Sequence, residues 1–97
     1  MNVARNDARH RFEATVEGYT AVLQYHEADG RVTLIHTEVP PELRGRRIAD
    51  ALARTALDHA RQQHLAVRPL CPFVQAFMKR HPEYADLVAP PAPPGGS

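Results

Sequence analysis

The 97-residue chain has very little cysteine or serine and no long apolar run, and each absence excludes a class of protein. Its one cysteine, Cys71, cannot form an internal disulfide, which fits a reducing compartment. Its one serine, Ser97, is the last residue, which argues against a Ser-His-Asp nucleophile. No stretch is long and apolar enough to span a membrane, and the first residues lack the apolar core of a signal peptide. We therefore expect a cytoplasmic protein.

Net charge is also small, because 12 Lys and Arg stand against 11 Asp and Glu, for a formal charge of +1. This balance gives no general attraction to nucleic acid or to an anionic membrane, so any electrostatic partner must be bound locally. The six histidines could suggest a metal. However, His59 and His64 are five residues apart on a predicted helix and face different directions, so we expect no metal site.

The hydrophobic pattern predicts one small domain, since a chain of 97 residues with 43% hydrophobic content can bury one modest core. Alternating apolar residues predict strands at 12–16, 19–25 and 32–39. Tight turns at Glu17-Gly18 and Asp29-Gly30 would join them into an antiparallel three-strand meander. The uninterrupted stretch 47–64 has apolar residues at helical spacing, and a short strand at 66–70 and a second helix at 73–80 follow it.

The predicted fold class is therefore α/β (α+β): a compact domain in which the meander is followed by a helix, a parallel strand and a helix. The third strand, the helix and the fourth strand would make a right-handed βαβ unit. Residues 1–9 are polar and unpatterned, so we predict a flexible N-terminus. The domain would occupy residues 10–88. The tail 89–97, APPAPPGGS, is predicted to be disordered or a linker.

The most informative segment is 36–49, HTEVPPELRGRRIA, which runs from a predicted strand through a turn into a predicted helix. Pro40 and Pro41 end the strand because each removes an N–H donor. The first N–H groups of a helix have no internal partner and the helix dipole is positive at that end, so this geometry binds phosphate. Three arginines reinforce the positive field: Arg44, Arg46 and Arg47.

Residues 44–49 resemble the motif R/Q-x-x-G-x-G/A of the GNAT superfamily of acyl-CoA N-acetyltransferases, in which this turn wraps the pyrophosphate of coenzyme A. Residues 67–84 resemble the later strand and helix of the small single-domain GNAT branch called YjdJ-type. The resemblance covers roughly residues 10–88. It departs from the motif at the fourth position, where Arg47 replaces the usual glycine. A helical backbone at Arg47 would tolerate the side chain, and its guanidinium could pair with a phosphate.

The resemblance implies that the chain binds acetyl-CoA or coenzyme A where the strands at 32–39 and 66–70 splay apart. The pantetheine arm of the cofactor would pair with the backbone like an added strand, and a backbone N–H there could polarise the thioester carbonyl. The acetyl group would pass to a primary amine of a small molecule or a protein, and the chain would be a monomer or a weak homodimer. The implied cofactor-binding residues are Thr37, Glu38, Val39, Arg44, Gly45, Arg46, Arg47, Ile48, Ala49, Cys71 and Phe73.

Two residues of the predicted strand 32–39 are candidates for the catalytic base. His36 is one, because histidine suits proton transfer near neutral pH. Strand alternation predicts that its side chain shares a face with Leu34 and Glu38. Glu38 is the rival base.

Cys71 is a third candidate for catalysis, because it lies where the short strand would enter the second helix. A helix N-terminus favours the thiolate form of a cysteine, which could accept an acetyl group. The same residue could instead line the cleft or fill a small space in the core. Many GNAT enzymes use a tyrosine of the last helix as the acid, but the aligned position is Phe77. Tyr84 is expected to pack the end of the chain onto the sheet.

Two other classes of function remain open. A non-catalytic CoA-binding or protein-interaction domain would use the same cleft without transferring a group. Nucleic-acid binding through the three arginines is disfavoured, because no aromatic residues are interleaved with them and the net charge is near zero.

Overall fold

Two tight turns fold the first half of the chain into a sheet. Glu17-Gly18 joins β2 (Arg11–Val16) to β3 (Tyr19–Ala28), and Asp29-Gly30 joins β3 to β4 (Arg31–Glu38). All four turn residues have positive φ, at 53°, 83°, 55° and 76°. Positive φ at both central residues is the type I′ geometry, whose twist matches that of the flanking strands. The predicted three-strand meander is confirmed.

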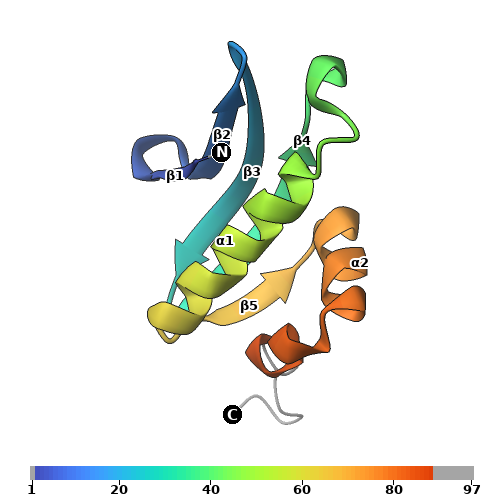
Figure 1. Ribbon diagram of the computed structural model, residues 1–97. Helices are drawn as coiled ribbons and strands as arrows, with labels where there is room; N and C mark the ends of the chain where they lie inside the picture. Colours follow the sequence, from blue (N-terminus) through green and yellow to red (C-terminus); the bar gives the residue numbers. More distant parts are fainter. Residues whose placement is uncertain (1, 89–97) are drawn as a thin grey trace, which may run out of the picture.

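The structure is a computed structural model that describes residues 2–88, so the tail predicted at 89–97 lies outside the described residues. Five strands form one sheet in chain order; neighbours among the first four are antiparallel and the fifth is parallel to β4 (Figure 1). The remaining elements are β1 (Val3–Asn6), α1 (Ile48–Gln62), β5 (Ala66–Pro69), α2 (Pro72–Arg80) and three short 3₁₀ helices, Asp7–Arg9, Pro41–Leu43 and Pro82–Leu87.

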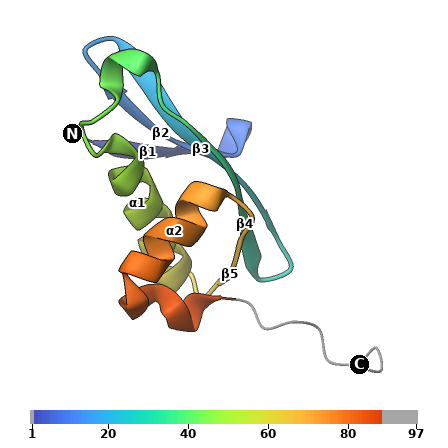
Figure 2. The same ribbon diagram turned by 90° about the vertical axis from the view of Figure 1, so that its right-hand side faces the viewer.

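Both α-helices lie on the same face of the sheet, and the core fills the layer between them and the strands (Figure 2). The helix α1 forms because no glycine or proline interrupts it and its apolar residues recur at helical spacing. It buries one face against the strands: Ile48, Leu52, Ala53, Ala56, Leu57 and Ala60. Among residues 2–88 no helix covers the opposite face of the sheet, which we call the uncovered face.

The strand β1 pairs with β2 at the edge of the sheet, whereas the sequence predicts flexibility over 1–9. Polar contacts hold this segment. The Nη1 of Arg5 lies 2.6 Å from Nε2 of His59 in α1, and the hydroxyl of Tyr25 donates to Asp7 Oδ1 at 2.7 Å. Hydrophobic periodicity does not reveal the strand, because Val3 is the one side chain of β1 that packs against the hydrophobic core.

Tyr25 provides a test of this attachment by pH. Burial, followed by the hydrogen bond to Asp7, raises the pKa of Tyr25 to about 12. An unfolded tyrosine ionises at about pH 10, so the stabilisation is complete below that pH and is lost as the pH rises through the folded value. We expect the free energy of unfolding, measured by urea denaturation, to fall by on the order of 1–3 kcal/mol between about pH 10 and pH 12.

The variant Tyr25→Phe removes this titration, so its free energy of unfolding should fall less over the same pH range. A smaller decrease should remain, because burial and Asp58 also raise the pKa of Tyr84. Identical pH profiles for the two proteins would contradict the attachment.

Candidate functional site

A pocket of about 240 Å³ lies where the chain leaves β4 and enters α1. Its walls come from the loop, from the first turn of α1 and from the start of α2. The lining residues are Val39, Leu43, Arg44, Gly45, Arg47, Ile48, Ala49, Asp50 and Phe73. Seven of these belong to the predicted cofactor-binding set; the four predicted residues that do not line the pocket are Thr37, Glu38, Arg46 and Cys71.

The sequence predicts a helical backbone for the residue before α1. This prediction is wrong, because the backbone of that residue is left-handed. Arg47 has φ 59° and ψ 26° and is the N-cap of the helix. Its carbonyl accepts the N–H of Ala51 at 3.2 Å, and its side chain makes no capping hydrogen bond. The N–H groups of Ile48, Ala49 and Asp50 therefore have no partner within the helix and are available to an anion.

The three arginines of the loop have different environments. Arg46 donates from Nη1 to Glu17 Oε2 at 2.6 Å, which binds it to the turn between β2 and β3. Arg44 and Arg47 line the pocket, and no carboxylate of residues 2–88 pairs with either. The side chains that can hold an anion in the pocket are therefore those of Arg44 and Arg47.

A carboxylate also lines the pocket. Asp50 lies in the first turn of α1, where a negative charge favours the helix dipole but repels a bound anion. Its Oδ1 lies 3.4 Å from Nη2 of Arg80 in α2, and this ion pair offsets the repulsion. Sequence reasoning did not find the pair, because the two residues are 30 positions apart and only the packing of α2 beside α1 brings them together.

The strands β4 and β5 separate at Leu34. Their ladder ends with the pair Leu34 and Pro69. The Leu34 carbonyl then accepts two N–H groups, from Leu70 at 3.0 Å and from Cys71 at 2.9 Å. Over residues 36–38, within the described part of the chain, β4 pairs with β3 alone. The strands thus diverge as the resemblance implies, and we call the place where they separate the split. The edge of β4 that faces α2 is open there.

A β-bulge changes the direction of the His36 side chain. The β3–β4 register shifts by one residue, which leaves Ile35 as the extra residue of β4. His36 therefore points away from the face that carries Leu34, and the prediction that these two share a face is wrong. The prediction that His36 shares a face with Glu38 is confirmed, since His36 Nε2 lies 3.9 Å from Glu38 Oε1. Both side chains are exposed on the uncovered face.

Cys71 is the N-cap of α2, and 3% of its surface is exposed. Its Sγ lies 3.4 Å from the Oγ1 of Thr37 in β4. This contact closes the inner side of the split, on the face opposite His36. The thiol is therefore buried and packs with the core cluster beside the split.

Tyr84 and Phe77 are also buried. The Tyr84 hydroxyl donates to Asp58 Oδ1 at 2.7 Å and accepts from Arg54 Nη1 at 3.2 Å. Both partners belong to α1, so Tyr84 packs the chain end onto the helix rather than onto the sheet. Phe77 is 1% exposed and has no ionisable group. Neither side chain offers a proton to the pocket.

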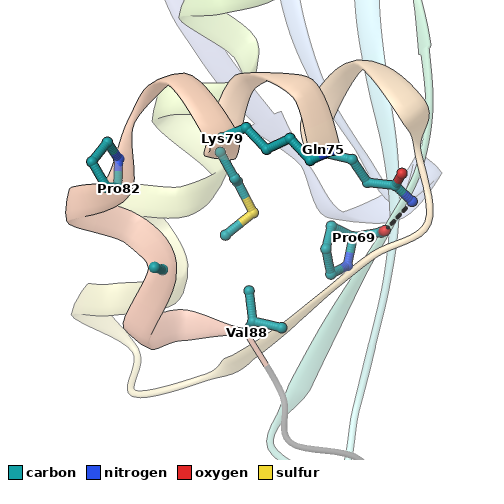
Figure 3. Close-up of a pocket in the computed structure, with 7 residues that line it drawn as sticks. Pro69, Gln75, Lys79, Pro82 and Val88 are labelled. Atoms are coloured by element: carbon teal, nitrogen blue, oxygen red, sulfur yellow. Dashed lines mark hydrogen bonds between the residues drawn. The ribbon is translucent and has the colours of Figure 1, made fainter.

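A second pocket, of about 440 Å³, lies behind α2 (Figure 3). Its lining is almost entirely apolar: Pro69, Gln75, Met78, Lys79, Pro82, Ala85 and Val88. Figure 3 shows Gln75 reaching the Pro69 carbonyl, to which its Nε2 donates at 2.9 Å. The pocket contains no arginine, and Lys79 is its one cationic lining residue. It therefore suits a phosphate-bearing ligand less well than the first pocket does.

Within residues 2–88, no three histidine, cysteine or carboxylate side chains are grouped so that they could hold a metal ion. None of the helices in the described part of the chain is long and apolar enough to cross a membrane.

Comparison with known proteins agrees with this geometry. Residues 11–87 match the sequence model of the GCN5-related N-acetyltransferases. The chain belongs to the GCN5-related N-acetyltransferase (GNAT) family. Its relatives include Protein NATD1 of Danio rerio, 34% identical over 93 residues, which are 91% of this chain and 84% of that protein. Protein NATD1 of Bos taurus is 35% identical over 95 residues, 93% of this chain and 84% of that protein.

A solved structure shares the GNAT fold. The solution structure of a GCN5-like protein from Staphylococcus aureus superposes with a TM-score of 0.69 at 20% identity, over 97% of this chain and 93% of that one. At this identity the likeness establishes the fold alone. The predicted α/β GNAT-like fold is confirmed, and the assignment to the YjdJ-type branch stays a prediction.

Arg47 gives a test of the loop geometry. A left-handed backbone costs a non-glycine residue about 1–2 kcal/mol, whereas glycine loses about 0.5–1 kcal/mol through its freer unfolded chain. We expect Arg47→Gly to raise the free energy of unfolding by about 0.5–1 kcal/mol, measured by urea denaturation.

The matched control is Arg46→Gly. Arg46 has no positive φ and is bound to Glu17, so this substitution should lower stability. A loss of stability in both variants would show that the left-handed backbone at Arg47 is not strained.

Proposed function

We propose that this GNAT domain binds acetyl-CoA and transfers the acetyl group to a primary amine. The pyrophosphate would lie against the first turn of α1, between Arg44 and Arg47. The pantetheine arm would follow the open edge of β4 along Thr37, Glu38 and Val39. This path brings the thioester to the split beneath the Leu34 carbonyl.

One observation carries the proposal: a pocket with a helix N-terminus and two arginines that no carboxylate of residues 2–88 pairs with adjoins a strand edge that no strand of this range covers. The pocket suits the phosphates because N–H donors and guanidinium groups converge on it. The edge suits the pantetheine amides because β4 offers backbone groups that no strand of residues 2–88 uses. These two features correspond to the two chemically different parts of the cofactor.

The reaction requires a nitrogen lone pair to attack the thioester carbonyl carbon. A carbon–nitrogen bond forms, the carbon–sulfur bond breaks, and coenzyme A leaves as a thiolate that takes up a proton. The amine must lose a proton, and His36 and Glu38 are the bases beside the split. A backbone N–H of the open edge would stabilise the developing oxyanion.

Cys71 is assigned to the wall of the split rather than to nucleophilic catalysis. Its burial and its contact with the Thr37 hydroxyl leave the sulfur no open approach to a thioester. The amine therefore attacks acetyl-CoA directly, with no acetyl group held by the enzyme.

The cofactor assignment predicts a stabilising effect of coenzyme A. A ligand that binds only the folded state raises Tm by mass action, so millimolar CoA should raise the Tm measured by differential scanning fluorimetry. Arg44→Ala should weaken binding by roughly 1–3 kcal/mol, because it removes a charge-assisted bond to phosphate. No thermal shift in the unmodified protein at millimolar CoA would refute the assignment.

Arg46→Ala is the control, because it removes the same charge from the same loop. Arg46 is committed to Glu17, so CoA affinity should change by less than about 0.5 kcal/mol. Equal losses in the two variants would mean that net charge, rather than the position of the guanidinium, decides the affinity.

The assignment of Cys71 predicts the behaviour of its thiol. Alkylation by iodoacetamide, followed by mass spectrometry, should be slow with or without CoA, because the sulfur is buried. Cys71→Ala should keep acetyl transfer within about tenfold, a loss attributable to packing. An acetyl adduct on Cys71 after incubation with acetyl-CoA, together with abolished turnover in the variant, would establish the nucleophile instead.

The alternative function, a CoA-binding or protein-interaction domain without catalysis, is favoured by the absence of a phenol at Phe77. Release of the CoA thiol from acetyl-CoA in the presence of an amine distinguishes the two functions. Thermal stabilisation by CoA without amine-dependent thiol release would support the alternative. A cytoplasmic location, where acetyl-CoA is present, stays a prediction.

A further inference from the structure

We infer that the acceptor is a small primary amine with one positive charge and an apolar body, bound on the uncovered face beside the split between β4 and β5. The inference rests on the proposed function, because the split is where the thioester would lie. It narrows the acceptor from any amine to one chemical class.

Two large apolar side chains are exposed beside the split. Ile35 is 43% exposed and Leu70 is 52% exposed. Ile35 is the extra residue of the bulge and follows Leu34, and the Leu70 N–H donates to the Leu34 carbonyl at 3.0 Å. The two residues therefore flank the same carbonyl, Ile35 from β4 and Leu70 from the position directly after β5. An apolar substrate group at this point would cover surface that is otherwise left in water.

The charges around the split can bind one ammonium group. On the strand positions of the uncovered face the carboxylates are Glu13 and Glu38. Glu13 is already bound by Arg11, which with Asn6 lowers its pKa. Glu38 is 72% exposed along its side chain, and its only ionic neighbour within residues 2–88 is His36, 3.9 Å away. One free carboxylate suits one positive charge.

A second positive charge on the acceptor would be repelled. Arg31 and Arg68 are exposed on the same face, and Arg68 lies two residues before Leu70. An acceptor that extends along β5 from Glu38 meets these guanidinium groups, which disfavours a polyamine or a lysine-rich peptide. An uncharged apolar body meets Ile35 and Leu70 instead.

The same arrangement supplies the proton transfer. Glu38 would attract the ammonium, and His36 would take the proton that the nitrogen loses as it attacks the thioester. The departing thiolate is protonated from solvent, because the Tyr84 hydroxyl is bound to Asp58 and Arg54 of α1 and Phe77 has no ionisable group.

The test compares three acceptors with acetyl-CoA: phenylethylamine, which is apolar; ethanolamine, which has no apolar body; and spermidine, which carries additional charges. Thiol release measures kcat/KM, which we expect to be about tenfold or more higher for phenylethylamine than for the other two. Ile35→Ser and Leu70→Ser should each raise KM for phenylethylamine roughly three- to tenfold while leaving the CoA-induced rise in Tm unchanged.

Tyr19→Ser is the matched control, because Tyr19 is 41% exposed but lies at the β2–β3 turn, away from the split. Its KM should not change. Higher kcat/KM for spermidine, or unchanged KM in both serine variants of the split, overturns the inference. If CoA raises Tm and none of the three amines is acetylated, the inference fails while CoA binding stands. If CoA gives no thermal shift, the proposed function fails as well.

Discussion

The Leu34 carbonyl is the point on which the architecture of the site depends. It accepts the N–H groups of both Leu70 and Cys71, so a single acceptor ends the β4–β5 ladder and starts the turn into α2. A regular parallel ladder would have continued along β4 and used the backbone groups proposed for the cofactor. The bulge at Ile35 lies directly after this carbonyl. Because β4 and β5 diverge and the bulge follows at once, the open edge of β4 and the side chains of the uncovered face both border the split.

Much of the fold could be predicted from the sequence, because its signals are local. The turns Glu17-Gly18 and Asp29-Gly30 predict the hairpins, and an uninterrupted stripe of apolar residues predicts α1. The side-chain direction of His36 could not be derived by simple alternation, because the bulge inserts a residue. The sequence does contain one indication of the bulge, because Leu34 and Ile35 are consecutive apolar residues in a strand with one buried face.

The electrostatics of the site were harder to predict, because they depend on contacts between distant segments. The motif supplies three arginines as equivalent candidates, and only the tertiary structure binds Arg46 to Glu17. The same holds for Arg80, whose pairing with Asp50 depends on the packing of α2. The backbone of Arg47 is a different case. The family's glycine at that position indicated a left-handed conformation, yet an arginine in its place favours the opposite expectation.

The far edge of the sheet is closed to further pairing. The N–H groups of Ala66 and Leu70 point toward β4, so the outward positions of β5 are Val67 and Pro69. Val67 already bridges Val88, and Pro69 has no N–H while its carbonyl is bound by Gln75. An incoming strand would find no continuous row of donors and acceptors there. β5 is therefore a poor edge for a strand from a second copy of the chain to pair with.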